Sequence, residues 1–130
     1  IETLIVAPTS DPTLSRLTMS TEGDEKVVEQ ITKQLNKLID VVTVIDLSDS
    51  DHIEREFMLI KFNEDNFPTN VFEDTNIISN VDGVINVQMI GTSTELDQLI
   101  ESVNLNEPIE IVRSGVLGIS SNKNILSIHN

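Results

Sequence analysis

The chain of 130 residues is long enough for one compact domain or two small ones, and folding would bury roughly two-thirds of its unfolded surface. Its 38% hydrophobic content excludes a wholly disordered chain, and its apolar runs are too short to cross a bilayer. A net charge of −14 argues against nucleic acid and anionic membrane surfaces as partners. The chain has no cysteine, which excludes disulfides and thiolate sites and fits a cytoplasmic location.

Short alternating or apolar runs predict the strands, and two segments of helical spacing predict the helices. The strands are expected at residues 2–7, 14–21, 41–47, 52–63, 75–80, 84–90 and 109–112. The helices are expected at residues 24–40 and 92–103. This mixture of hairpins and amphipathic helices predicts an α+β fold.

The first two strands are expected to form a hairpin, because residues 8–12 between them are rich in turn-forming types. Leu17 and Met19 fall on one face of its second strand. In the helix that follows, the apolar residues form one stripe, and Glu29 and Lys33 add an i,i+4 pair on the solvent face.

The strand at 52–63 is apolar on both faces in its middle, which is typical of a central strand. Residues 64–72 are ambiguous, but Pro68 argues against a helix there. A tight turn at Asp82 and Gly83 is expected to join the next two strands.

Residues 92–95 have the spacing of a capping box, which predicts the start of the second helix. Apolar residues at helical spacing follow it as far as Val103. Gly115 and Gly118 come after the last predicted strand, and we expect these glycines to end it.

An internal repeat relates the two halves of the chain at an offset that places Gly23 on Gly91 and Leu35 on Val103. Each half reads strand, strand, helix, strand. The second half has an additional strand and a short connection ahead of this pattern. The complete unit is therefore expected to be the βαββαβ, or ferredoxin-like, motif.

We accordingly expect two ferredoxin-like domains, the first lacking its opening strand and helix. The expected boundaries are 1–48 for the partial N-terminal domain, 49–121 for the second domain and 122–130 for a polar tail. The missing strand would be a central one, which leaves backbone groups without partners. Either the chain is a fragment of a longer product, or the first domain is completed by another chain or rearranged.

His52, Glu54 and Glu56 alternate on one strand and could share a face, where they would offer a metal or acid/base site. The stronger interpretation is a solvated, charged strand end, because Arg55 lies between the carboxylates and the three residues begin the strand. A metal site would also need a second histidine nearby, and His129 lies in the tail.

Other candidate sites are weaker still. No serine lies in a nucleophile-elbow pattern, and the glycines at 115 and 118 lack the lysine and helix of a phosphate loop. The acidic runs lack the ligand spacing of a calcium-binding loop. With no credible catalytic or metal-ligating residues, the sequence indicates binding or regulation. A small ferredoxin-like enzyme would have to depend on His52, Glu54 and Glu56.

Four segments carry a resemblance to a known family. They are TLSRLTM at 13–19, QLNKLIDV at 34–41, EREFMLIK at 54–61 and RSGVLG at 113–118. Residues 1–48 resemble the first regulatory domain, of ACT type, of acetolactate synthase small subunits. The later segments resemble that family's second domain in the same order, as far as about residue 121.

The resemblance implies a non-catalytic regulatory subunit that forms dimers and acts in the cytoplasm, in valine, leucine and isoleucine biosynthesis. The family's large catalytic subunit carries thiamine diphosphate, Mg²⁺ and usually FAD, so none of these cofactors is expected on this chain. The small subunit stimulates the large one and confers feedback inhibition by valine, which binds between ACT domains.

The chain departs from the family at its beginning. The family's valine site uses a glycine-containing loop together with the start of the next strand, and only the latter is present, at Ile1 and Glu2. We therefore expect the chain as given to bind valine poorly and to associate with itself or with a large subunit. The alternative is a free-standing ACT-type amino-acid sensor that acts on a different enzyme.

Overall fold

The computed structural model describes residues 3–10, 15–20, 29–31, 33, 34, 37 and 51–122. The chain divides into two compact units, which are described separately. Residues Ile1–Glu54 and Gly118–Asn130 form the first unit, and Arg55–Leu117 form the second.

The first unit contains the predicted hairpin. Strand β1 (Thr3–Pro8) pairs antiparallel with β2 (Ser15–Ser20), in a register that runs from Thr3 opposite Ser20 to Pro8 opposite Ser15. The Arg16 side chain also donates to the carbonyl oxygen of Gly118, at 2.6 Å. Both strands are confirmed to within about two residues of the expected bounds, since strand ends are the least certain part of any such prediction.

Part of the first predicted helix is also confirmed. Residues 29–31, 33, 34 and 37 are helical. Ile31 is half-buried, whereas Glu29 and Lys33 are exposed, as the expected apolar stripe and solvent face require. The strand expected at 41–47 lies outside the described residues.

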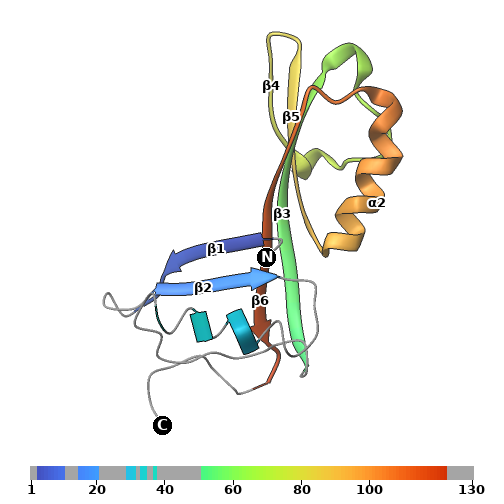
Figure 1. Cartoon of the computed structure of the whole chain (residues 1–130). Coiled ribbons are helices and arrows are strands. Elements are labelled where there is room, and N and C mark those ends of the chain that lie inside the picture. Colours follow the sequence, from blue (N-terminus) through green and yellow to red (C-terminus); the bar gives the residue numbers. More distant parts are fainter. Residues whose placement is uncertain are drawn as a thin grey trace. The chain divides into compact units, whose positions relative to one another are not determined.

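The second unit is built on a four-stranded sheet (Figure 1). Its strands are β3 (His52–Asn63), β4 (Ile77–Val81), β5 (Val84–Gly91) and β6 (Glu110–Ser120). They lie in the order β4-β5-β3-β6, which is the 4-1-3-2 order of a ferredoxin-like sheet read from the other side. β3 is central, with bounds that match the prediction.

Strand β5 pairs antiparallel with both of its neighbours, β3 and β4. β3 pairs with β5 from Glu56 opposite Gly91 to Asn63 opposite Val84. The β4–β5 turn has positive φ at both Asp82 (54°) and Gly83 (77°), a combination that fits the right-handed twist of a hairpin. The predicted tight turn is therefore confirmed.

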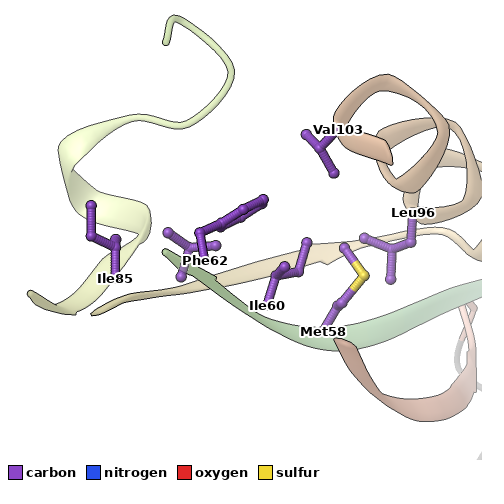
Figure 2. Close-up of a cluster of buried hydrophobic side chains, with 7 residues drawn as sticks. Met58, Ile60, Phe62, Ile85, Leu96 and Val103 are labelled. Atoms are coloured by element: carbon purple, nitrogen blue, oxygen red, sulfur yellow. The ribbon is translucent and has the colours of Figure 1, made fainter. Parts of the chain in front are cut away.

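Helix α2 (Ser93–Val103) packs on one face of this sheet, and the core of the unit lies between them (Figures 1 and 2). The side chain of Thr92 caps the helix by accepting from the backbone N–H of Glu95 at 3.1 Å, as the capping spacing predicts. The buried hydrophobic side chains in the described part are Met58, Ile60, Phe62, Ile85, Val87, Leu96 and Val103.

Two short 3₁₀ turns, η2 (Glu64–Asn66) and η3 (Asp74–Asn76), follow β3 where a ferredoxin-like domain has its first helix. Between them Phe67 and Phe72 pack on Phe62, with ring centroids 5.5 and 5.8 Å away. The expectation that no α-helix forms there is confirmed, and aromatic packing covers this part of the core instead.

The expectation that two glycines end the last strand is wrong. β6 continues through Gly115 and Gly118 to Ser120. Gly115 has a φ of +89°, a conformation that glycine adopts without the penalty a Cβ would bring, and its N–H donates to the Glu56 carboxylate at 3.0 Å. The glycine thus permits a local irregularity inside the strand rather than its end.

No helix among the described residues is long and apolar enough to span a membrane.

Candidate functional site

The side chains of β3 that face α2 include one carboxylate. Glu56 shares its strand face with Met58, Ile60 and Phe62, and only 6% of it is exposed. Among the residues that the structure describes, Glu56 is the one charged residue that is buried. A buried carboxylate is costly unless it is paired and hydrogen-bonded, so its partners decide what it does.

Glu56 lies at the centre of a network that joins β3, β6 and α2. Its Oε1 accepts from Nη2 of Arg113 at 2.7 Å and from Oγ of Ser93 at 3.2 Å. Its Oε2 accepts from the backbone N–H of Gly115 at 3.0 Å. The other guanidinium nitrogen of Arg113, Nη1, donates a hydrogen bond to Oδ1 of Asp97 on α2. Nη2 also donates a hydrogen bond to the carbonyl oxygen of Ser93.

The network keeps both of its central groups charged. Burial alone would raise the pKa of Glu56, but the hydrogen bonds from Arg113, Gly115 and Ser93 and the charge of Arg113 outweigh burial and hold that pKa below its ordinary value. The pKa of Arg113 is raised above its ordinary value, most by its hydrogen bond to Glu56 and next by its hydrogen bond to Asp97.

This arrangement suits anchoring better than catalysis. Every buried side-chain nitrogen and oxygen in the described part has a hydrogen-bond partner. A general acid or base needs a pKa near the working pH, whereas the pKa of Glu56 is moved away from neutrality. The network therefore fixes the start of α2 against the sheet.

The structure divides the three residues that the sequence grouped as a possible metal or acid/base site. His52 Nε2 and Glu54 Oε1 lie 2.9 Å apart at the start of β3, and Glu56 turns to Arg113. Among residues that the structure describes, no three His, Cys, Asp or Glu side chains group as metal ligands. His129 lies outside those residues.

The interpretation of all three as a solvated strand end is wrong for Glu56. Its burial follows from the alternation of the strand, because Glu56 is in step with the apolar residues Met58, Ile60 and Phe62. That alternation was the available signal. The identity of Arg113 as its partner had no local signal, since the two residues are 57 positions apart.

A shallow groove lies on the sheet face that α2 does not cover. It has a volume of about 180 Å³ and is lined by Leu59, Ile60, Lys61, Asn86, Glu110 and Val112. Nζ of Lys61 lies 3.4 Å from Oε1 of Glu110 across it. Sequence reasoning did not single out this groove, although apolar residues on both faces of β3 indicated that its second face is not purely polar.

Ile1 and Glu2, the expected edge of an effector site, lie outside the described residues. Their role stays a prediction.

Two family models match the chain in succession. The first, described as an AHAS small subunit-like ACT domain, matches residues 1–43. The second, described as the small subunit of acetolactate synthase, matches residues 55–122. Together they match the segments that carried the resemblance in both parts of the sequence.

Curated relatives and a solved structure agree with these models. The chain is 44% identical over 134 residues to the acetolactate synthase isozyme 3 small subunit of Escherichia coli K12, covering 97% of this chain and 82% of that protein. It is 45% identical over 130 residues to the small subunit of Buchnera aphidicola subsp. Baizongia pistaciae, covering 94% and 81%.

The crystal structure of the acetolactate synthase small subunit from Thermotoga maritima matches with a TM-score of 0.79 and 28% identity, over 95% of this chain and 81% of that one. The α+β fold class is thereby confirmed, as is the family resemblance. The chain belongs to the acetolactate synthase small subunit family, and its leading part is an ACT domain of that family.

Proposed function

We propose that the chain is the non-catalytic regulatory subunit of an acetolactate synthase and that it stimulates a separate large catalytic subunit. The observation that carries this proposal is the succession of both family models along one chain, together with 44% identity to a named small subunit over 97% of this chain and 82% of that protein. A free-standing ACT-type sensor would need only the first of these matches.

The catalytic cofactors belong to the partner in this proposal. Thiamine diphosphate, Mg²⁺ and FAD would lie on the large subunit, where two molecules of pyruvate, or pyruvate and 2-oxobutyrate, are condensed. The proposal is supported by the chemistry of the Glu56 network, whose charged groups already have protein partners. The reaction would take place in the cytoplasm, on the way to valine, leucine and isoleucine.

Valine is the proposed effector, and Ile1 and Glu2 would lie at the edge of its site. The proposal also includes self-association of the chain, because an ACT-type effector site between domains needs two copies.

Reconstitution tests this function. Purified large subunit of the same organism is assayed for acetolactate formation from pyruvate, alone and with increasing amounts of this chain. We expect the rate to rise and to saturate at a fixed molar ratio, because a specific complex has a defined stoichiometry. A valine titration of the same mixture measures the effector response separately.

An acidic ACT-domain protein from an unrelated enzyme serves as the control, because it matches the charge and fold but not the family. A rate that stays at the level of the large subunit alone at every ratio of this chain would contradict the proposed function. Stimulation by the control to the same extent would show that the effect is not specific.

A further inference from the structure

Two strands of the second unit continue past its boundary. The unit consists of Arg55–Leu117, whereas β3 begins at His52 and β6 ends at Ser120. The two strands are hydrogen-bonded neighbours in the four-stranded sheet (Figure 1). We call this pair of strands the β3–β6 ribbon. Because the ribbon is shared by both units, a bend in it lies on the path of the chain from one unit to the other.

The two strands of the ribbon have different lengths between hydrogen bonds at its ends. At one end the N–H of Ile109 donates to the carbonyl oxygen of Lys61 at 2.7 Å, and at the other the N–H of Ser121 donates to that of Asp51 at 3.1 Å. Ten residue steps separate the two bonds on β3, from 51 to 61, and twelve separate them on β6, from 109 to 121. In a regular antiparallel ladder the two numbers are equal. β6 therefore has extra residues opposite β3, as in a β-bulge.

The irregularity lies at Ser114 and Gly115, where side chains act as partners of the backbone. The N–H of Phe57 on β3 donates to Oγ of Ser114 at 3.0 Å. The N–H of Gly115 donates to Oε2 of Glu56 at 3.0 Å, and Oγ of Ser114 donates to the carbonyl oxygen of Gly115 at 2.8 Å. The φ of Gly115 is +89°, far from the extended conformation of a strand. Both strands therefore depart from the regular ladder at the same level.

The part of the chain ahead of this irregularity is anchored to α2. Arg113, two residues ahead of Gly115, donates to Glu56 at 2.7 Å and also to Asp97 on the helix. Glu56 accepts a further hydrogen bond from Ser93 at 3.2 Å. The carboxylate and the guanidinium are thus held against the core of the second unit, and the contacts of their network along β6 end at Gly115.

This combination suits a hinge. A hinge residue must change φ and ψ at little cost, and glycine has no Cβ to oppose a positive φ. Gly115 is buried, so its N–H must also stay paired as the backbone turns, because a buried N–H without an acceptor is costly. A carboxylate offers about four lone-pair sites where a backbone carbonyl offers two, so the bond from Gly115 to Glu56 can survive a larger rotation.

We propose that Ser114 and Gly115 form a hinge in β6, at which the β3–β6 ribbon bends and the two units change their orientation, while Glu56, held by Arg113, keeps the Gly115 N–H paired. Any ligand that binds one orientation better would shift the population toward that orientation. The hinge itself requires neither valine nor a large subunit, so it stands or falls separately from the proposed function.

Distance measurements between two nitroxide labels on the full chain, by pulsed electron paramagnetic resonance, test the hinge. Because the chain has no cysteine, Lys33→Cys and Leu105→Cys place one label on each unit, both at exposed positions. Val81→Cys with Leu105→Cys is the reference pair within the second unit. An excess of unlabelled chain removes distances between different molecules. We expect the distance distribution between the units to be about twice as wide as that of the reference pair, or wider.

Gly115→Ala is expected to narrow the distribution between the units, because alanine rarely adopts a φ of +89° and so confines the backbone at the hinge. Gly83→Ala is the matched control. Gly83 also has a positive φ, of +77°, and an added Cβ there would meet nothing within 4 Å, so this variant carries similar backbone strain in the β4–β5 turn, away from the ribbon. It should leave the distribution unchanged. Urea unfolding establishes that both variants are folded.

Three outcomes would overturn the hinge. The first is a distribution between the units as narrow as that of the reference pair. The second is an unchanged distribution in Gly115→Ala, and the third is equal narrowing in Gly115→Ala and Gly83→Ala. None of these outcomes bears on stimulation of a large subunit, which the reconstitution measures separately.

Amide hydrogen exchange of the unmodified chain gives a second readout that does not depend on the folding of a variant. In a ribbon without a hinge, the middle is better protected than the frayed ends. Phe57 lies in the middle and donates to the Ser114 hydroxyl, whereas Ile109 lies at one end and donates to a backbone carbonyl. Bending loosens the bond from Phe57, so we expect its amide to exchange about tenfold faster than that of Ile109, or more. Exchange of Phe57 as slow as that of Ile109, or slower, would overturn the hinge.

Discussion

At the scale of single residues, the ion pair between Glu56 and Arg113 joins β3 and β6 to the start of α2. A buried ion pair contributes little net stability compared with apolar packing, but the loss of one partner leaves the other uncompensated. Glu56 is 6% exposed and accepts hydrogen bonds from three different residues. The surrounding protein therefore stabilises its charged form.

Glu56→Gln is expected to lower the free energy of unfolding by about 2 kcal/mol, because the uncharged amide loses a charge-assisted bond and leaves Arg113 without its buried counter-charge. Glu54→Gln is the matched control on the same strand. The Glu54 side chain is 55% exposed, so its substitution should cost about 0.5 kcal/mol or less. Urea denaturation measures both values, and equal effects would show that burial of Glu56 does not matter.

The same residue predicts how stability depends on pH. The folded-state pKa of Glu56 is lower than its ordinary value of 4.5, so the folded protein favours the charged form. This contribution to stability is fully present above the unfolded-state pKa and is lost as the pH falls through the folded-state pKa.

Urea unfolding between about pH 7 and pH 3 measures that contribution. We expect the free energy of unfolding to fall on acidification, and to fall less steeply in Glu56→Gln, which has no proton to gain at this position. Parallel pH profiles for the two proteins would contradict a lowered pKa at Glu56.

At the scale of elements, α2 carries the packing of the second unit. Leu96 and Val103 are two helical turns apart, so both point to the sheet, and they are almost completely buried. The helix begins where Thr92 caps it, next to the Ser93 and Asp97 groups that Arg113 holds. Capping and ion pairing thus fix the same end of the helix.

Thr92→Ala is expected to destabilise the protein by about 1 kcal/mol, because the N–H of Glu95 loses its acceptor. Thr92→Ser should restore most of the loss, since serine caps equally well. Thr94→Ala, at an exposed position inside the helix, is the control and should be neutral or slightly stabilising, because alanine has the higher helix propensity. Thermal unfolding ranks the three variants, and a Thr92→Ser loss as large as that of Thr92→Ala would argue against the cap.

At the scale of the whole molecule, acidic residues outnumber basic ones by 22 to 8. The resulting net charge of −14 opposes the close approach of any other strongly acidic molecule. The charge therefore does more than exclude nucleic acid as a partner. It also favours partner surfaces that carry little negative charge.

Local patterns in the sequence were sufficient for most of the fold. The bounds of β3, the turn at Asp82 and Gly83 and the cap at Thr92 each depend on neighbours within a few residues, and each was predicted. The extension of β6 was not predicted, because a glycine ordinarily weakens a strand and the group that accepts the Gly115 N–H is 59 positions away in the sequence.

The sequence by itself determined the α+β class, the order of the elements in the second unit and the family. Each of these depends on hydrophobic periodicity, turn-forming residues or family segments, and each such pattern lies within a short stretch of the chain. Only the tertiary structure decided that Glu56 is buried against Arg113, that β6 runs on to Ser120 and that Phe57 of β3 lies opposite Ile90 of β5. These features depend on which strands lie side by side, and that pairing joins residues that are far apart along the chain.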